Sequence, residues 1–365
     1  MGRIRWRYFD FWLTAALILL LVIGLAMVYS ATRNTAGLED STRRQAIFIG
    51  IGLALMFALA TVDYSLLEPI AGGIYGLVIA ALGAVLIIGR VTHGAQRWID
   101  LGFMLFQPSE FAKLALIIFL AHYFADHADD IRSGRVFLIS LGAALLPMLL
   151  IYLQPDLSTA LLLGVIWLGM AVVAGVNMAY VGALAGLGTV AAPAIWYSLH
   201  DYQRLRVLAF INPAADLQGA GYNVGQAMIA IGSGGWLGKG FASGTQSQLH
   251  FLRVRHTDFI FSVLAEELGF IGALVLFALL AFLLWRLLRV AGFARDRFGE
   301  LIAVGMAVYI FVQSAVNIAM NMALIPATGI PLPFVSFGNN ALLSLLLGMG
   351  LAQSVALRHK RLDFA

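Results

Sequence analysis

Residues 11–31 read FWLTAALILLLVIGLAMVYSA and contain no charged side chain. A helix of this length is about 32 Å long, which matches the hydrocarbon thickness of a bilayer. The run is too long for the apolar core of a signal peptide, and no small-x-small cleavage site ends it clearly. We therefore expect a retained first membrane-spanning helix, preceded by Arg3, Arg5 and Arg7.

Similar apolar runs recur along the chain. Of its 365 residues, 61% are hydrophobic and only 12% are charged, whereas about 25% of the residues of a soluble domain are charged. The periodicity is helical, and no alternating pattern predicts a membrane β-barrel. The sequence therefore predicts an all-α polytopic membrane protein, a single transmembrane domain over residues 1–365. About ten spans are expected, at 11–31, 45–62, 70–89, 110–124, 136–153, 157–174, 179–198, 258–286, 300–323 and 340–357.

The distribution of Lys and Arg predicts how these spans are oriented. Ten spans place both termini on one side, and that side carries 12 basic residues against 6 on the other once the longest loop is left out. The positive-inside rule then predicts that both termini are cytoplasmic, with one large extracytoplasmic loop at about 199–257 between spans 7 and 8. The polar, motif-like stretches fall on the outer face, where ATP is absent. A reaction there must draw its driving force from the substrate.

Composition excludes several classes of site and function. The chain has no Cys, so disulfides and thiolate metal sites are excluded, and its seven His show no metal-ligand spacing. The net charge of +4 is attributed to topology and anionic lipid, so no nucleic-acid binding is predicted. The glycine-rich stretch 232–240 lacks the P-loop spacing, so no nucleotide is expected. We find no internal repeat, which argues against a secondary transporter.

Two polar segments precede expected spans 4 and 6. Pro108 suits the first turn of a helix, which places Glu110 and Lys113 one turn apart on one face. They form either an ion pair at the lipid interface or a functional pair that faces the bundle interior. Asp156 either caps the following helix or lines an outward-facing cavity.

The stretch around Asp258 is the most informative. Asp258 stands at the start of a long expected helix, where a carboxylate is a favourable cap, yet three carboxylates within ten residues of a membrane helix are costly unless they have a function. Further on, three prolines within 326–333 predict a rigid, non-helical re-entrant turn. In the long loop, residues 223–231 are apolar enough to form a short interfacial helix.

Together these segments carry a resemblance. The motifs are Gln96-Arg97-Trp98, Phe106-Gln107-Pro108-Ser109-Glu110, Gln154-Pro155-Asp156-Leu157, His200-Asp201-Tyr202-Gln203-Arg204, Ile231-Gly232-Ser233-Gly234-Gly235, Gly244-Thr245-Gln246-Ser247-Gln248-Leu249, His256-Thr257-Asp258-Phe259-Ile260-Phe261 and Gly329-Ile330-Pro331-Leu332-Pro333. In number, order and spacing the chain resembles the SEDS family (shape, elongation, division and sporulation), in its RodA-type branch. It departs from the family pattern at Leu105, Arg253, Val254, Asn339 and Asn340.

The resemblance implies a peptidoglycan glycosyltransferase of the bacterial cytoplasmic (inner) membrane that polymerises lipid II during cell elongation. It implies a class B penicillin-binding transpeptidase and the cell-elongation machinery as partners, and a divalent cation, Mg or Mn, whose ligands the sequence does not identify. Asp258 corresponds to the family's essential catalytic carboxylate. The residues expected to bind substrate are Glu110, Lys113, Gln107, Arg97, Asp156, Arg204, Lys239, His256 and Thr257.

The expected chemistry is the transfer of a sugar from a lipid diphosphate. Asp258 would take the proton of the acceptor hydroxyl. The diphosphate that leaves would be neutralised by a bound metal or by basic side chains, for which the candidates, not ranked by the sequence, are Lys113, Arg204, Arg206, Lys239 and Arg97. Two other functions remain open from the sequence. One is a lipid II flippase whose cavity only binds the substrate, and the other is a non-catalytic scaffold that activates its transpeptidase partner.

Overall fold

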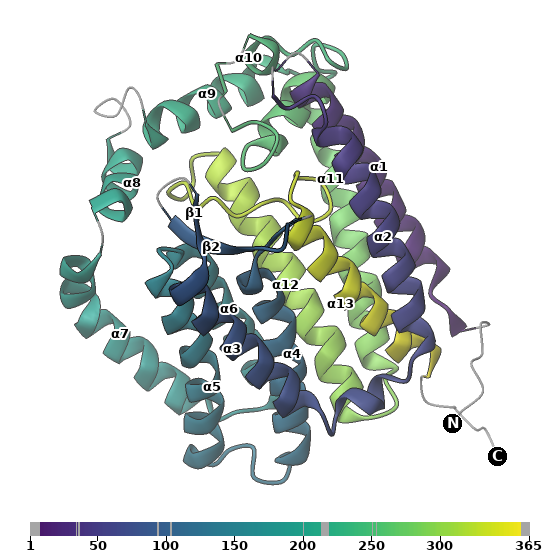
Figure 1. Cartoon of the computed structure of the whole chain (residues 1–365), viewed down its shortest axis with the longest axis vertical. Helices are drawn as coiled ribbons and strands as arrows, with labels where there is room; N and C mark the ends of the chain where they lie inside the picture. Colours follow the sequence, from purple (N-terminus) through teal and green to yellow (C-terminus); the bar gives the residue numbers. More distant parts are fainter. Residues whose placement is uncertain are drawn as a thin grey trace.

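The structure is a computed structural model that describes residues 8–33, 35, 37–92, 95–102, 104–199, 201–212, 219–249, 251–252 and 254–358. Arg3, Arg5, Arg7, His200 and Arg253 lie outside these residues. Helices dominate the chain (Figure 1). They are α1 (Phe11–Thr32), α2 (Ser41–Thr61), α3 (Ala71–Ile88), α4 (Pro108–Asp126), α5 (Gly134–Leu153), α6 (Leu157–Ala174), α7 (Met178–Ser198), α8 (Asp201–Ile211), α9 (Ala220–Ser233), α10 (Thr245–Gln248), α11 (Ile260–Gly292), α12 (Arg297–Asn321) and α13 (Asn339–Leu357), with the short 3-10 helix η2 (Tyr64–Leu67).

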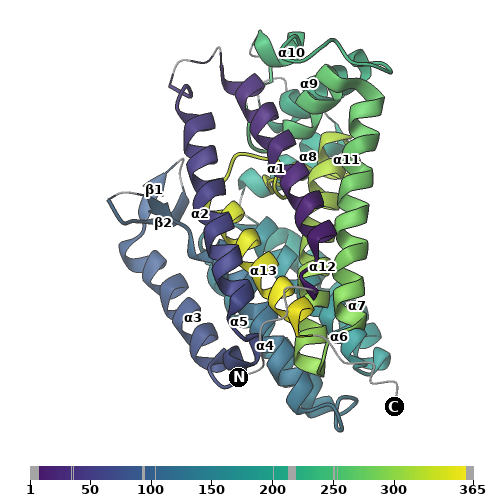
Figure 2. The same cartoon turned by 90° about the vertical axis from the view of Figure 1, so that its right-hand side faces the viewer.

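The prediction of a polytopic helical membrane protein is confirmed. All ten expected spans coincide with helices, α1 to α7 and α11 to α13. Within the described part of the chain, nine of these helices are long and apolar enough to cross a membrane, and α7 has a shorter apolar stretch, Met178–Ala194. The start of α1 and the end of α13 lie at the same end of the bundle, since the backbone N–H of Asp10 donates to Gln353 Oε1 at 3.1 Å (Figure 2).

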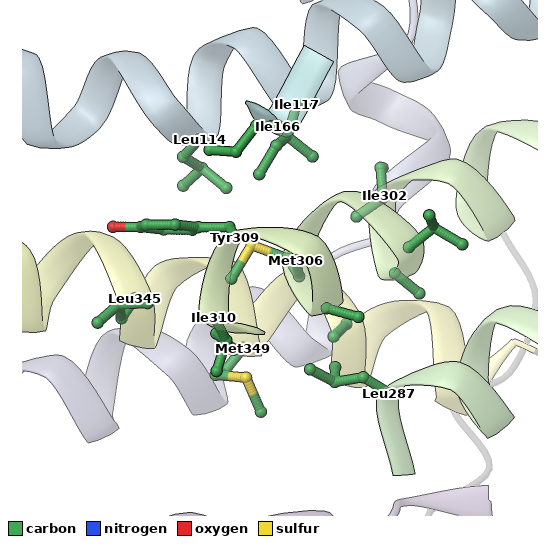
Figure 3. Packing of buried hydrophobic residues seen from close by; sticks show 14 of the residues in the cluster. Leu114, Ile117, Ile166, Leu287, Ile302, Met306, Tyr309, Ile310, Leu345 and Met349 are labelled. Atoms are coloured by element: carbon green, nitrogen blue, oxygen red, sulfur yellow. The ribbon is translucent and has the colours of Figure 1, made fainter. Parts of the chain in front are cut away.

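Helix α12 forms the centre of the bundle. It packs against α4, α6, α11 and α13, and Figure 3 shows Met306, Tyr309 and Ile310 of α12 among side chains of these neighbours. Small residues allow close approach elsewhere: a Cβ on Gly350 of α13 would lie 2.7 Å from the backbone oxygen of Met56 in α2. Such packing of small residues holds membrane helices together where no hydrophobic driving force exists between them.

A small sheet was not predicted. Strands β1 (Arg90–Thr92), β2 (Ala95–Asp100) and β3 (Leu105–Phe106) form an antiparallel sheet in the order β1-β2-β3 between α3 and α4. Strands of two to six residues are too short to leave a periodic signal in the sequence. Asn340 attaches the end of this sheet to the start of α13, since its Nδ2 donates to Leu105 O at 2.8 Å and its Oδ1 accepts from Gln107 N at 3.3 Å. Leu105 and Asn340, two of the family departures, are therefore in contact.

The long loop between α7 and α11 is largely helical. Its helix α9 contains the expected short helix at 223–231. Helix α11 begins at Ile260 and ends at Gly292, so it starts two residues later and ends six residues later than expected. Gly269 interrupts it with φ +67° and ψ −165°, a conformation that favours glycine.

The glycine-rich stretch packs against this interruption. Phe270 N donates to Gly235 O at 2.8 Å, and Lys239 N donates to Glu266 O at 3.0 Å. A Cβ on Gly238 would lie 2.1 Å from Glu267 O. The glycines therefore allow the loop backbone to approach α11 closely, which gives the glycine-rich stretch a structural role.

Candidate active site

A cavity of about 1540 Å³ gathers most of the residues that the sequence singled out. The sheet, α2, α4, α6 and α8, together with the segments before α11 and between α12 and α13, contribute to its walls. The predicted site residues that line it are Arg97, Gln107, Glu110, Lys113, Asp156, His256, Thr257 and Asp258. Four segments that are far apart in the sequence thus meet at one place: β2, the start of α4, the start of α6 and the segment before α11.

Asp258 lies just before α11, in the segment that joins the long loop to the helix. The residue at the cap of α11 is Phe259, and the cap makes no side-chain hydrogen bond. The interpretation of Asp258 as a helix cap is therefore wrong. Its side chain instead lines the cavity. Burial raises the pKa of Asp258 to about 6, opposed by a hydrogen bond from Thr257 and the positive charge of Arg206.

A second cavity, of about 730 Å³, meets the first at Asp258. Both cavities are lined by Arg206, Val254, Asp258, Ala327 and Gly329. The second cavity extends along α8, where Leu205, Leu208 and Ala209 line it. The carboxylate of Asp258 therefore lies where a larger, more polar space joins a smaller, largely apolar one.

Arg206 of α8 is the basic residue beside this junction. Its Nη1 lies 3.4 Å from Ala327 O and 3.3 Å from Thr328 O, so it donates to the segment that joins α12 to α13. Sequence reasoning named Arg206 only as one of several cations for a diphosphate. The orientation of the Arg206 side chain towards the junction depends on helix α8, which was not predicted from the sequence.

Arg97 of β2 lines the larger cavity next to the start of α6. Its Nε donates to Gln154 O at 3.0 Å, its Nη2 donates to Pro155 O, and its Nη1 lies 3.8 Å from Asp156 Oδ2. Asp156 also caps α6, since its carboxylate accepts from Thr159 N at 3.3 Å. The capping interpretation of Asp156 is therefore confirmed, and the same residue also lines the cavity.

Glu110 and Lys113 form the expected ion pair in the first turns of α4, with 2.7 Å between Lys113 Nζ and Glu110 Oε2. The Lys113 side chain is 1% exposed and its ammonium group lies 4.9 Å from the centre of the Tyr309 ring. The pair faces α12 and the cavity, away from lipid. Gln107 precedes this helix, and its Nε2 donates to Ser109 Oγ at 3.1 Å.

His256 and Thr257 complete the segment before Asp258. The Nδ1 atom of His256 is buried and has no hydrogen-bond partner among the described residues. Burial, together with the charge of Arg255, lowers the pKa of His256, which favours the neutral ring. Thr257 Oγ1 lies 3.5 Å from Val254 O.

Two predicted substrate-binding residues lie away from both cavities. Arg204 donates to Trp196 O at 3.1 Å and to Tyr197 O at 2.5 Å, and so satisfies carbonyls at the end of α7. Lys239 pairs with Glu266 Oε1 at 2.9 Å and donates to Thr245 Oγ1 at 2.7 Å, within the loop that packs on α11. Both side chains have structural partners here, and neither is brought together with Asp258.

The polar face of α12 was not predicted from the sequence. Gln313, Asn317 and Asn321 are all fully buried in a helix that was treated only as a span. Their spacing of four residues places them on one face of the helix, towards the segments that hold Asp258. Three amides at this spacing in an apolar helix are a recognisable signal, since polar groups inside membrane helices are costly unless they bind one another or a functional segment.

The described residues contain no group of three or more His, Asp or Glu that could hold a metal ion. Three carboxylates that line the larger cavity, Asp100, Asp156 and Glu110, each lie within 4 Å of a basic side chain.

Comparison with known proteins identifies the family. A model of the family described as "Cell cycle protein" (FtsW, RodA, SpoVE) matches residues 11–361. The chain is 39% identical over 350 residues to peptidoglycan glycosyltransferase MrdB of Escherichia coli K12, covering 95% of this chain and 93% of that one. It is 37% identical over 355 residues to stage V sporulation protein E of Bacillus subtilis, covering 95% and 96%.

Two solved structures share the fold. A chain from a peptidoglycan synthase complex that coordinates polymerisation and crosslinking matches with a TM-score of 0.82 and 31% identity, covering 95% of this chain and 97% of that chain. The rod shape determining protein RodA of Thermus thermophilus matches with a TM-score of 0.71 and 30% identity, covering 95% and 96%. The chain therefore belongs to the SEDS family of FtsW, RodA and SpoVE cell cycle proteins.

Proposed function

We propose that this multi-pass membrane protein is a peptidoglycan glycosyltransferase that polymerises lipid II into β-1,4-linked glycan strands during cell elongation. The relatives named above as peptidoglycan glycosyltransferases support the reaction class. The observation that carries the proposal is the position of Asp258 where two cavities meet. A polymerase must hold two large lipid-linked molecules with their reacting ends together, and a junction of two spaces suits that need.

In the proposed reaction Asp258 is the general base. It takes the proton of the acceptor's 4-hydroxyl as that oxygen attacks the anomeric carbon of the donor sugar. The bond from this carbon to the diphosphate breaks, so undecaprenyl diphosphate leaves and the α-linked donor becomes a β-1,4 link. A carboxylate whose pKa is raised to about 6 by burial remains largely ionised at neutral pH, and is a stronger base than an ordinary aspartate.

The leaving diphosphate needs positive charge rather than a proton. Arg206, Lys113 and Arg97 line the larger cavity with Asp258. Fixed cations in a site that excludes water stabilise a developing anion far better than they would in bulk water. The driving force is contained in the diphosphate link of the donor, so a site without nucleotide suffices.

The requirement for a divalent cation remains a prediction that rests on membership of the family. The described side chains include no group of three or more His, Asp or Glu that could hold the cation, and no step above depends on it. Mg²⁺ is commonly held by few carboxylates together with substrate phosphates, so we expect any such ion to arrive with the diphosphate.

The proposed partner is a class B penicillin-binding transpeptidase of the cell-elongation machinery. The similar chain of known structure comes from a peptidoglycan synthase complex that combines polymerisation with crosslinking, which supports a partner of this kind. We further propose that the cavities open on the extracytoplasmic face of the inner membrane, where the lipid-linked sugar is used.

Polymerisation by the purified chain in detergent micelles tests the proposal against the two alternatives. Lipid II is the sole added substrate and gel separation of the glycan products is the measurement. A flippase has no membrane to act across in a micelle, and a scaffold does nothing without its partner. We expect glycan strands from the chain alone. Absence of product from folded, monodisperse protein, both alone and with its transpeptidase, would exclude the polymerase.

A further inference from the structure

The backbone of Asp258 accepts hydrogen bonds from side chains of α12. The carbonyl oxygen of Asp258 accepts two hydrogen bonds, from Asn317 Nδ2 at 2.9 Å and from Asn321 Nδ2 at 3.0 Å. Both asparagine side chains are fully buried. Two donors on a single carbonyl use both of its lone pairs, so this oxygen has a fixed direction.

The same two asparagines join Asp258 to the other walls of the site. Asn317 Nδ2 also donates to Ile330 O at 2.8 Å, in the segment between α12 and α13. Asn321 Oδ1 accepts from Ser262 N at 3.2 Å and from Ser262 Oγ at 2.6 Å, in the first turn of α11. One face of α12 therefore sets the distance between the Asp258 segment, the 326–333 segment and the start of α11.

The two residues before Asp258 are held in the same way. The carbonyl of Thr257 accepts from Ser336 Oγ at 2.6 Å, and that of His256 accepts from Phe337 N at 2.9 Å. Three consecutive carbonyls thus point towards α12 and the segment that follows it. The Asp258 carboxylate lines both cavities.

We propose that Asn317 and Asn321 are positioning residues that fix the main chain of Asp258 and so hold its carboxylate at the junction of the two cavities. This inference rests on the proposed role of Asp258 in polymerisation. These hydrogen bonds offset the cost of burying two amides in a membrane helix. They also fix the position of Asp258, and the rate of the proposed reaction depends on that position.

The test is a double-mutant cycle with Asn317→Leu, Asn321→Leu and the combined variant. Leucine keeps the size of the side chain and removes the donors. Each single variant leaves one donor on the Asp258 carbonyl, so we expect a several-fold loss in kcat for each and a loss on the order of 10²-fold for the pair, with KM for lipid II little changed. Ser314→Ala is the matched control, because Ser314 is buried on the same helix and its Oγ has no partner among the described residues.

The outcomes separate this inference from the proposed function. Asp258→Asn is measured in the same assay: if it is inactive while the paired leucine variant keeps wild-type kcat, the positioning role is wrong and the polymerase stands. If Asp258→Asn keeps full activity, the role of Asp258 itself fails. A rise in KM with unchanged kcat would also overturn the positioning role. If the paired variant does not fold, Ser336→Ala takes its place, because this change removes the donor to Thr257 O. The positioning role then requires that Ser336→Ala also lowers kcat.

Discussion

Arg206 and Asp258 both approach Gly329: a Cβ on this glycine would lie 3.6 Å from Asp258 Oδ2 and 4.0 Å from Arg206 Nη1. The backbone of Gly329 has φ +77°, a region that favours glycine. A residue without a side chain thus separates the proposed base from a cation. Both groups also line the two cavities that meet at Asp258.

Replacement of Arg206 tests the cation. We expect Arg206→Gln to lower kcat/KM by about 10²–10³-fold, the usual cost of removing one group that stabilises a developing anion. Because the charge of Arg206 lowers the pKa of Asp258, its loss should also move the acidic limb of the pH profile to higher pH. Arg204→Gln is the matched control, since Arg204 binds carbonyls at the end of α7. Equal losses in both variants would refute the assignment.

The pH dependence of polymerisation tests the protonation state of Asp258. A general base must be ionised, and the pKa of Asp258 is raised to about 6. Activity should therefore be full above this value and fall as the pH is lowered through about 6, with a slope of one proton. Initial rates of lipid II polymerisation between pH 5 and 8 measure this. A rate that stays flat down to pH 5 contradicts an essential ionised Asp258.

The Glu110–Lys113 pair can be tested for structural and functional roles separately. Removing one partner leaves a buried charge, so Glu110→Gln and Lys113→Met should each destabilise the protein by about 3–5 kcal/mol. The double variant should recover much of that stability, since no unpaired charge remains. We expect it to stay poorly active, because the cation at the cavity is lost. Thermal unfolding in detergent and polymerisation rates give the two readouts, and full activity of a stable double variant would make the pair purely structural.

The interruption of α11 predicts an intolerant glycine. A Cβ on Gly269 would lie 2.3 Å from Gly238 N and 2.6 Å from Trp236 O. The backbone conformation alone costs a side chain about 1–3 kcal/mol, and the overlap with backbone adds to it. Gly269→Ala should therefore lower the thermal midpoint clearly. Gly225→Ala, in α9 with nothing within 4 Å of the new methyl group, should leave it unchanged or raise it.

Much of the fold could be predicted because membrane spans leave a strong, local signal. The first span and the nine others were placed from apolar length alone, and Pro108 correctly predicted a helix start next to Glu110. The three-stranded sheet and the break at Gly269 were not predicted. Both depend on contacts between distant segments, such as Gly269 with Gly238, which no local pattern shows.

The site was predicted in part, because its polar segments are also local signals in the sequence. The polar segments at the ends of spans were recognisable, and the cavity brings eight of the ten predicted residues together. Side-chain direction was not predictable: Arg204 and Arg206 stand two residues apart, yet only Arg206 faces the cavity. Asn317 was missed because a buried amide in a span was not weighed as a functional signal.

Asp258 is the proposed base for polymerisation. The most direct test of this role compares the rate of glycan formation from lipid II by purified Asp258→Asn protein with that of the wild-type chain. Glu300→Gln, at the start of α12, is the control for folding and purification. We expect the asparagine variant, still folded and still able to bind lipid II, to form no measurable polymer, while the control polymerises at the wild-type rate. Polymerisation by Asp258→Asn at the wild-type rate would contradict this role.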